Sequence, residues 1–111
     1  GGYQIKHIAN DELSIDLDPK NAMLDLDKLT FPLVIRPWQQ GDEFKPLGMR
    51  GKKMISDFLI DAKVPLAQKE MVYVLESAND IAWLVGYRIS DDYKIDANTK
   101  KVLHLSRSSA D

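Results

Sequence analysis

The 111-residue chain contains no cysteine. This absence excludes a disulfide framework and a thiolate zinc site, and the fold does not depend on an oxidising compartment. The sequence also lacks an apolar run long enough to span a bilayer, and its amino end lacks the charged start and apolar stretch of a secretory signal. We therefore expect a cytoplasmic protein that makes no contact with membranes.

Histidine is scarce as well. His7 and His104 are far apart in the sequence, and neither has carboxylates around it at ligand spacing, so no metal centre is expected. The chain also shows no pairing of a nucleophile with a base and no phosphate-binding loop. A self-contained enzyme is therefore not expected.

A strong excess of one charge is missing too. Lysine and arginine number 15 and aspartate and glutamate 17, for a net charge of −2, which argues against a nucleic-acid binder that is basic all over. The distribution is uneven, because residues 36–63 carry 6 basic and 4 acidic side chains, whereas acidic residues outnumber basic ones on either side. An anionic partner must therefore be met by a local patch in the middle of the chain.

The length fits one domain, residues 1–111, with its own core. Hydrophobic residues make up 44% of the chain and charged residues 29%, as in ordinary globular proteins. The last residues, 106–111, are polar and are expected to form a flexible tail.

Short patterns predict a mainly β structure. Alternation of apolar and polar residues predicts a hairpin over 3–8 and 12–18 and a further strand over 23–26, with the aspartates on a solvated face. The apolar run 33–35, between two prolines, is typical of a buried strand. A second hairpin is expected from 71–75 and 81–89, with Gly86 marking a bulge or a close backbone approach, and a last strand over 102–105.

Helical spacing is confined to the middle of the chain. Met54, Ile55, Phe58, Leu59 and Ala62 recur at intervals of one, three and four, which predicts a short amphipathic helix with one apolar stripe. Residues 66–70 are expected to form a second short helix behind a proline.

The stretch that precedes the first helix is rich in glycine and cations. Gly48 and Gly51 would let the backbone approach a ligand, and Arg50, Lys52 and Lys53 would lie near the amino end of the helix, where free N–H groups attract anions. We interpret this arrangement as an anion site. The alternative is a glycine turn with solvated lysines that bind nothing, and these residues alone do not decide between the two.

A block with the pattern G-D-x-F-x-P-L-G-M-x-G-x-K-K begins at Gly41 and carries a specific signal. Further matching residues are Ser56-Asp57-Phe58, Asp61, Lys63-Val64-Pro65, Ile81, Trp83, Val85-Gly86 and Arg88-Ile89. Over roughly residues 30–105, the chain resembles the carboxy-terminal domain of tRNA(Ile)-lysidine synthetase. Similar domains occur in the β subunit of bacterial phenylalanyl-tRNA synthetase. The resemblance implies an α+β fold, a three-layer β/β/α sandwich with short, mostly antiparallel strands and one or two short helices after residue 51.

The resemblance also implies a function. The complete enzyme of this family is an ATP-dependent ligase that uses ATP and lysine to convert the wobble cytidine of the AUA-reading isoleucine tRNA to lysidine. That chemistry belongs to a separate amino-terminal domain with an S-G-G-x-D-S phosphate loop, which is absent from this sequence. The chain is therefore expected to be an accessory domain, inactive alone and without a cofactor or metal. It would bind the acceptor-stem side of the tRNA and contact the amino-terminal catalytic domain.

The resemblance assigns contact with tRNA phosphates to basic residues in and around the block. These are Arg36, Lys45, Arg50, Lys52, Lys53, Lys63 and Arg88, with Gly41, Gly48 and Gly51 shaping the loop. Little base specificity is expected, because duplex RNA is read mainly through its shape and backbone. The alternative hypothesis is a protein–protein or inter-domain docking module, whose exposed apolar residues contact other domains or a second copy in a homodimer.

Overall fold

The computed structural model describes residues 3–9, 16, 18 and 20–107. The strands are β1 Tyr3–Ala9, β2 Ala22–Asp25, β3 Leu33–Pro37, β4 Glu43–Phe44, β5 Lys53–Met54, β6 Tyr73–Ser77, β7 Asp80–Leu84, β8 Arg88–Ile89 and β9 Lys101–Arg107. The helices are α1 Ile55–Asp61 and α2 Leu66–Lys69, with short 3-10 turns η2 Leu26–Lys28 and η3 Asp91–Tyr93. Within these described residues, no helix has the length and apolar character needed to cross a membrane.

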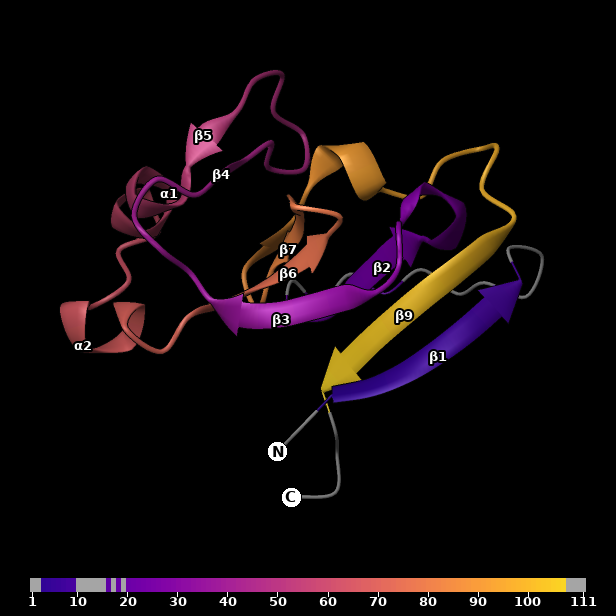
Figure 1. Cartoon of the computed structure of the whole chain (residues 1–111), viewed down its shortest axis with the longest axis horizontal. Helices are drawn as coiled ribbons and strands as arrows, with labels where there is room; N and C mark the ends of the chain where they lie inside the picture. Colours follow the sequence, from indigo (N-terminus) through magenta and orange to yellow (C-terminus); the bar gives the residue numbers. More distant parts are fainter. Residues whose placement is uncertain (1–2, 10–15, 17, 19, 108–111) are drawn as a thin grey trace.

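The elements form three layers. A three-stranded sheet has the order β1-β9-β2, a four-stranded sheet has the order β3-β6-β7-β8, and β4 and β5 form a small ribbon. Figure 1 shows the four-stranded sheet in the middle, with β1 and β9 on one side and α1 and α2 on the other. The described strand pairs are antiparallel. The α+β fold with short, mostly antiparallel strands and two short helices is therefore confirmed.

Two hydrophobic cores separate the layers. Leu24, Leu103 and Trp83 belong to the core between the two sheets, and a second core joins α1 to the other face of the four-stranded sheet. Val74 and Leu75 are neighbours in β6, yet Val74 lies in the helix-side core and Leu75 in the sheet-side core. Successive side chains of a strand point to opposite faces, so the four-stranded sheet is buried on both sides at β6.

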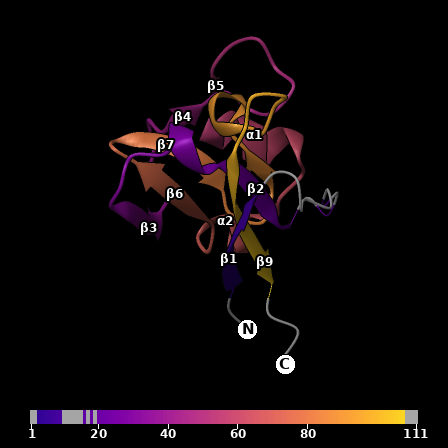
Figure 2. The same cartoon turned by 90° about the vertical axis from the view of Figure 1, so that its right-hand side faces the viewer.

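β1 pairs with β9 along its whole length, from Tyr3 opposite Arg107 to Ala9 opposite Lys101. The start of β1 and the end of β9 consequently lie side by side (Figure 2). The sequence placed the partner of β1 at residues 12–18, which lie mostly outside the described residues, and the described positions 16 and 18 are not in a strand. β9 also extends two residues into the stretch expected to be a flexible tail, and residues 108–111 lie outside the described part.

The prediction of a buried strand at 33–35 is wrong in its burial. β3 forms there, but it is the edge strand of its sheet, and the side chains of Val34 and Ile35 are 47% and 63% exposed. An apolar run between prolines is compatible with a protected edge as well as with a central strand, and only the sheet order separates the two.

The aspartates around β2 were expected on a solvated face, and Asp25 is the exception. It is buried, and its carboxylate accepts hydrogen bonds from the Thr99 hydroxyl at 2.8 Å and from the Asp27 N–H at 3.0 Å. The second bond caps η2. Because these donors satisfy the carboxylate, it can be buried at this position.

Both predicted helices are confirmed. The second hairpin forms from β6 and β7, but its second strand, expected over 81–89, ends at Leu84, and β8 is a separate strand. The stripe on α1 is narrower than expected, because Met54 belongs to β5 and Ala62 follows the helix, which leaves Ile55, Phe58 and Leu59 buried. Gly86 lies in the turn between β7 and β8 with φ +84°. The irregularity of the hairpin is instead at Leu75/Glu76.

Candidate nucleic-acid interface

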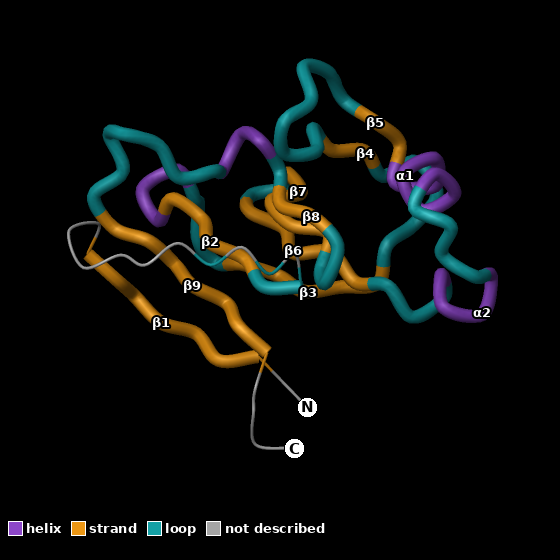
Figure 3. Tube along the Cα trace, turned by 180° about the vertical axis from the view of Figure 1, so that it is seen from behind, coloured by secondary structure: helices purple, strands orange, loops and turns teal. Residues whose placement is uncertain are grey.

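The segment that joins β4 to β5, residues 45–52, projects beyond the sheets (Figure 3). Its base is fixed by backbone bonds to the end of the four-stranded sheet. The Leu47 N–H donates to the Ile89 carbonyl at 3.0 Å, and the Asp91 N–H donates to the Lys45 carbonyl at 2.7 Å. The loop therefore leaves a rigid sheet beside β8, and its tip extends away from both cores.

Glycine is required in this region at two positions. Gly41 has φ +95° and Gly48 has φ +87°, the left-handed region that side chains disfavour. Gly51 lies outside that region, and a Cβ at any of these three glycines would meet nothing within 4 Å. The backbone conformation, rather than a lack of space, therefore makes glycine necessary at Gly41 and Gly48, and Gly51 has no such requirement.

Asp91 anchors the first turn of the loop. The Gly48 N–H donates to its carboxylate at 3.1 Å, and Lys94 Nζ lies 3.2 Å away. The bond from Gly48 is the largest cause that lowers the pKa of Asp91; burial opposes it, and Lys94 lowers the pKa further. Lys45 is 3.8 Å from both Asp91 and Asp92, so it is only loosely paired.

Arg36 does not belong to this loop. Its Nη1 and Nη2 donate to the two carboxylate oxygens of Asp42 at 2.9 and 3.0 Å, and its Nε pairs with Glu76. The hydrogen bonds to Asp42 are the largest cause that raises the pKa of Arg36. All three guanidinium nitrogens are therefore used within the protein, which gives Arg36 a structural role; its contact with phosphate stays a prediction.

The expected anion site at the amino end of α1 is not formed. The helix has 7 residues, Asp57 supplies negative charge in its first turn, and the Ile55 N–H is occupied by the Asp42 carbonyl at 2.9 Å. Lys53, in β5, is paired with Asp61, the last residue of α1. The cation that should have faced an external anion is therefore neutralised by an internal carboxylate.

Four of the cations chosen from the sequence remain around the loop, and we refer to them as the loop face: Lys45, Arg50, Lys52 and Arg88. Arg50 is exposed, and no carboxylate pairs with it among the described residues. Lys52 lies 3.7 Å from Glu43 with both side chains about half exposed, and such surface pairs contribute little, about 0–1 kcal/mol. Arg88 rests on the Phe58 ring, 5.1 Å from the ring centroid.

Lys63 lies apart from the loop face. It follows the carboxyl end of α1, and a seven-residue helix is about 10 Å long. Its side chain is exposed, and its φ of 57° is left-handed. Four of the seven basic residues chosen from the sequence thus lie in or beside the loop. Arg36 and Lys53 are instead paired with carboxylates, although Lys53 lines the same hollow as Lys52, and Lys63 lies beyond α1.

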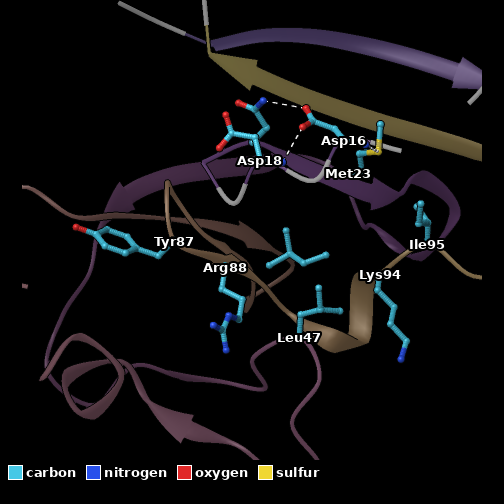
Figure 4. A pocket seen from close by; sticks show the side chains of 10 residues that line it. Asp16, Asp18, Met23, Leu47, Tyr87, Arg88, Lys94 and Ile95 are labelled. Carbon is cyan, nitrogen blue, oxygen red and sulfur yellow. Dashed lines mark hydrogen bonds between the residues drawn. The ribbon is translucent and has the colours of Figure 1, made fainter. Parts of the chain in front are cut away.

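Sequence reasoning missed a hollow of about 350 Å³ at the foot of the loop. Figure 4 shows Asp16, Asp18 and Met23 along one side of it, Leu47 and Arg88 from other segments on the opposite side, and Ile95 at one end. These residues are scattered over most of the chain, so no local pattern could have grouped them. No set of three or more metal-ligating side chains was found in the described part of the chain.

Comparison with known proteins assigns the family. The model of the family described as "TilS substrate C-terminal domain" matches residues 33–106. The chain belongs to this family. Its curated relatives include the tRNA(Ile)-lysidine synthases of Parabacteroides distasonis, 42% identical over 92 residues, and Dehalococcoides mccartyi, 39% identical over 107 residues. These alignments cover 83% and 94% of this chain but 21% and 23% of the relatives, so the chain spans about a fifth of their length.

Solved structures support the same fold. The crystal structure of a TilS C-terminal domain superposes with a TM-score of 0.76 at 21% identity and covers 95% of this chain and 82% of that one. An N-terminal fragment of the phenylalanyl-tRNA synthetase β-subunit from Pyrococcus horikoshii gives a TM-score of 0.64 at 15% identity, covering 77% and 27%. The TilS C-terminal domain family therefore shares its three-layer arrangement with a domain of a tRNA synthetase.

Proposed function

We propose that this chain is the tRNA-binding domain of a tRNA(Ile)-lysidine synthase and that the loop face contacts the sugar–phosphate backbone. The observation that carries the proposal is Arg50. It lies on a projecting, glycine-turned loop, exposed and without a carboxylate partner among the described residues. Three further cations surround the base of the same loop, and family membership supplies the kind of partner.

The loop face suits phosphate chemically. Arginine binds phosphate through two parallel hydrogen bonds, and Arg88 is held by Phe58, so less side-chain freedom is lost on binding. Lys45 and Lys52 have carboxylate neighbours only at 3.7–3.8 Å. Such loose pairs can exchange a carboxylate for a phosphate at small cost.

The remaining expectations belong to the same proposal. The complete protein would convert the wobble cytidine of the AUA-reading isoleucine tRNA to lysidine in the cytoplasm, with ATP and lysine as substrates of its amino-terminal catalytic domain. This chain would hold the acceptor-stem side of the tRNA. Because backbone contacts dominate, it would contribute affinity and orientation more than base recognition.

The test is tRNA affinity of the complete protein by filter binding. Arg50→Ala combined with Arg88→Ala should weaken binding by about 1–2 kcal/mol, or about 5- to 30-fold, through loss of charged contacts. The matched control is Lys100→Ala with Lys101→Ala, which removes the same charge from two exposed residues at the start of β9. Equal affinities for wild type and the Arg50/Arg88 variant would overturn the proposal.

A second candidate function is docking on another domain or a second copy. Its support is a set of exposed large apolar residues, among them Ile35 at 63%, Leu66 at 78% and Met71 at 76%. Light scattering of the isolated chain, with and without tRNA, separates the two functions. A dimer that is indifferent to tRNA supports docking, and a monomer that shifts on adding tRNA supports the first proposal.

A further inference from the structure

The hollow at the foot of the loop adjoins the loop face directly. Leu47 belongs to the loop and also lines the hollow, and Arg88 belongs to both the loop face and the lining. Figure 4 shows the Arg88 side chain leaving the hollow on the side opposite Asp16 and Asp18. An RNA strand whose backbone lies on the loop face would therefore pass the mouth of this hollow.

The lining combines apolar surface with acceptor groups. Met23, Leu47 and Ile95 contribute the apolar part, and more of the lining is apolar than polar. The volume of about 350 Å³ is at the small end of the range of about 300–1,000 Å³ usual for ligand sites. A flat, largely apolar group fits such a space better than a phosphate does.

One carboxylate in the lining is available to a ligand. Asp16 is committed, because its oxygens accept from the Asp18 N–H at 2.9 Å, from Asn21 at 2.8 Å and from the His104 ring at 2.8 Å. Asp18 uses Oδ1 for the Lys20 N–H at 2.9 Å, and its Oδ2 has no partner within the described residues. The carboxylate accepts hydrogen bonds and cannot donate them when ionised.

We infer that the hollow receives one unpaired nucleotide whose base carries its amino group at C4 of a pyrimidine or C6 of a purine, that is, cytidine or adenosine. This inference rests on the proposed function. The base would lie against the apolar lining with its amino group toward Asp18, while its phosphate stays near Arg88. Carboxylates accept from the cytosine amino group, and single-stranded RNA is read through such base edges. Uracil presents a carbonyl oxygen at that position, which would face the carboxylate without a hydrogen atom between them.

The experiment uses the complete protein and an RNA stem in three forms: blunt, with a 3′ ACCA tail, and with a 3′ UUUU tail. Binding of the ACCA form should be about 10- to 150-fold tighter than that of the UUUU form, the effect of one hydrogen bond to a charged group. Asp18→Asn adds N–H donors to the site and should reduce or reverse this preference. A general loss of structure would lower the affinity for all three RNAs alike. A change in the ratio of the ACCA affinity to the UUUU affinity therefore identifies recognition of the base.

A second variant tests the hollow without changing Asp18, whose carboxylate also bonds within its own segment. Ile95→Trp fills the hollow and should lower the affinity for the ACCA form to that for the blunt stem. Leu66→Trp, on exposed α2, is the control and should leave the ratio of the ACCA affinity to the blunt-stem affinity unchanged.

If the blunt stem binds as tightly as the ACCA form to the wild type, the inference fails and the proposed function stands. If ACCA and UUUU tails bind alike, the inference also fails. If none of the RNAs binds, both fail together.

Discussion

Arg36 and Asp42 form a two-armed ion pair, with Nη1 2.9 Å from Oδ2 and Nη2 3.0 Å from Oδ1. Arg36 also pairs with Glu76, and the Asp42 carbonyl accepts from the first N–H of α1. The pair thus ties β3 and β6 to the start of β4 and the amino end of α1. A cation that the sequence suggests for RNA binding instead holds the framework from which the loop projects.

The first prediction concerns the stability supplied by this pair. Arg36→Lys should lower the free energy of unfolding by about 1–3 kcal/mol, because an ammonium group cannot make both parallel bonds and reach Glu76. Urea denaturation at neutral pH measures the change. Arg50→Lys is the matched control and should change the stability by less than about 0.5 kcal/mol, since Arg50 is exposed. Equal effects of the two substitutions would contradict the structural role of Arg36.

A second prediction follows from the protonation of Asp42. Burial acts to raise its pKa, but the hydrogen bonds from Arg36 and from the Gln39 N–H outweigh burial, and the pKa lies below the ordinary value of 3.8. Because the folded-state pKa is lowered, its contribution to stability is fully present above 3.8 and is lost as the pH falls through the folded-state value.

Urea unfolding of wild type and Asp42→Asn between neutral pH and the acid limit tests this. The variant should be less stable at neutral pH, and its stability should fall less steeply below the ordinary pKa of aspartate. If the free energy of unfolding falls equally steeply with pH in the two proteins, Asp42 does not titrate in this way.

The third prediction compares two glycines of the loop. Gly48→Ala should cost about 1–2 kcal/mol of stability, because φ is +87° there and alanine disfavours that region. Gly51→Ala should be neutral or stabilise by about 0.4–1 kcal/mol, since its φ is not left-handed and the unfolded chain becomes less flexible. Thermal unfolding of both variants is the measurement. A cost at Gly51 as large as at Gly48 would be inconsistent with the described turn.

The fourth prediction concerns the helix-side core. Leu59 is 0% exposed and its neighbour Ile60 is 58% exposed. Leu59→Ala should therefore destabilise by about 2–5 kcal/mol, whereas Ile60→Ala should stay within about 0.5 kcal/mol of wild type. Chemical denaturation of this pair reports which face of α1 is buried, and a reversed order would mean that the helix is rotated.

Local patterns in the sequence were enough to predict α1, α2 and the β6–β7 hairpin, because each depends on neighbours a few residues apart. The pairing of β1 with β9 joins the two ends of the described chain, and alternation in either strand says nothing about its partner. The exposure of Ile35 depends on sheet order in the same way. The resemblance supplied what the patterns could not, namely the layer arrangement.

The candidate site was predictable in part for a similar reason. The glycine and lysine spacing located the loop and its cations, including Arg50 and Lys52. Asp42 and Asp61 lie within a few residues of the cations they pair with, but Glu76 is 40 residues from Arg36. Counting charges along the sequence could not show which of the nearby carboxylates face a cation, so it could not separate free cations from paired ones.

The most direct test of the central claim is the salt dependence of tRNA binding by the complete protein. Plots of the logarithm of affinity against the logarithm of salt concentration should be shallower for Arg50→Ala with Arg88→Ala than for wild type. The slope should fall by about 1.4–1.8, since each lost phosphate contact removes about 0.7–0.9. If the slope is the same in both proteins while the affinity of each is measurable, the loop face does not contact phosphate and the account is contradicted.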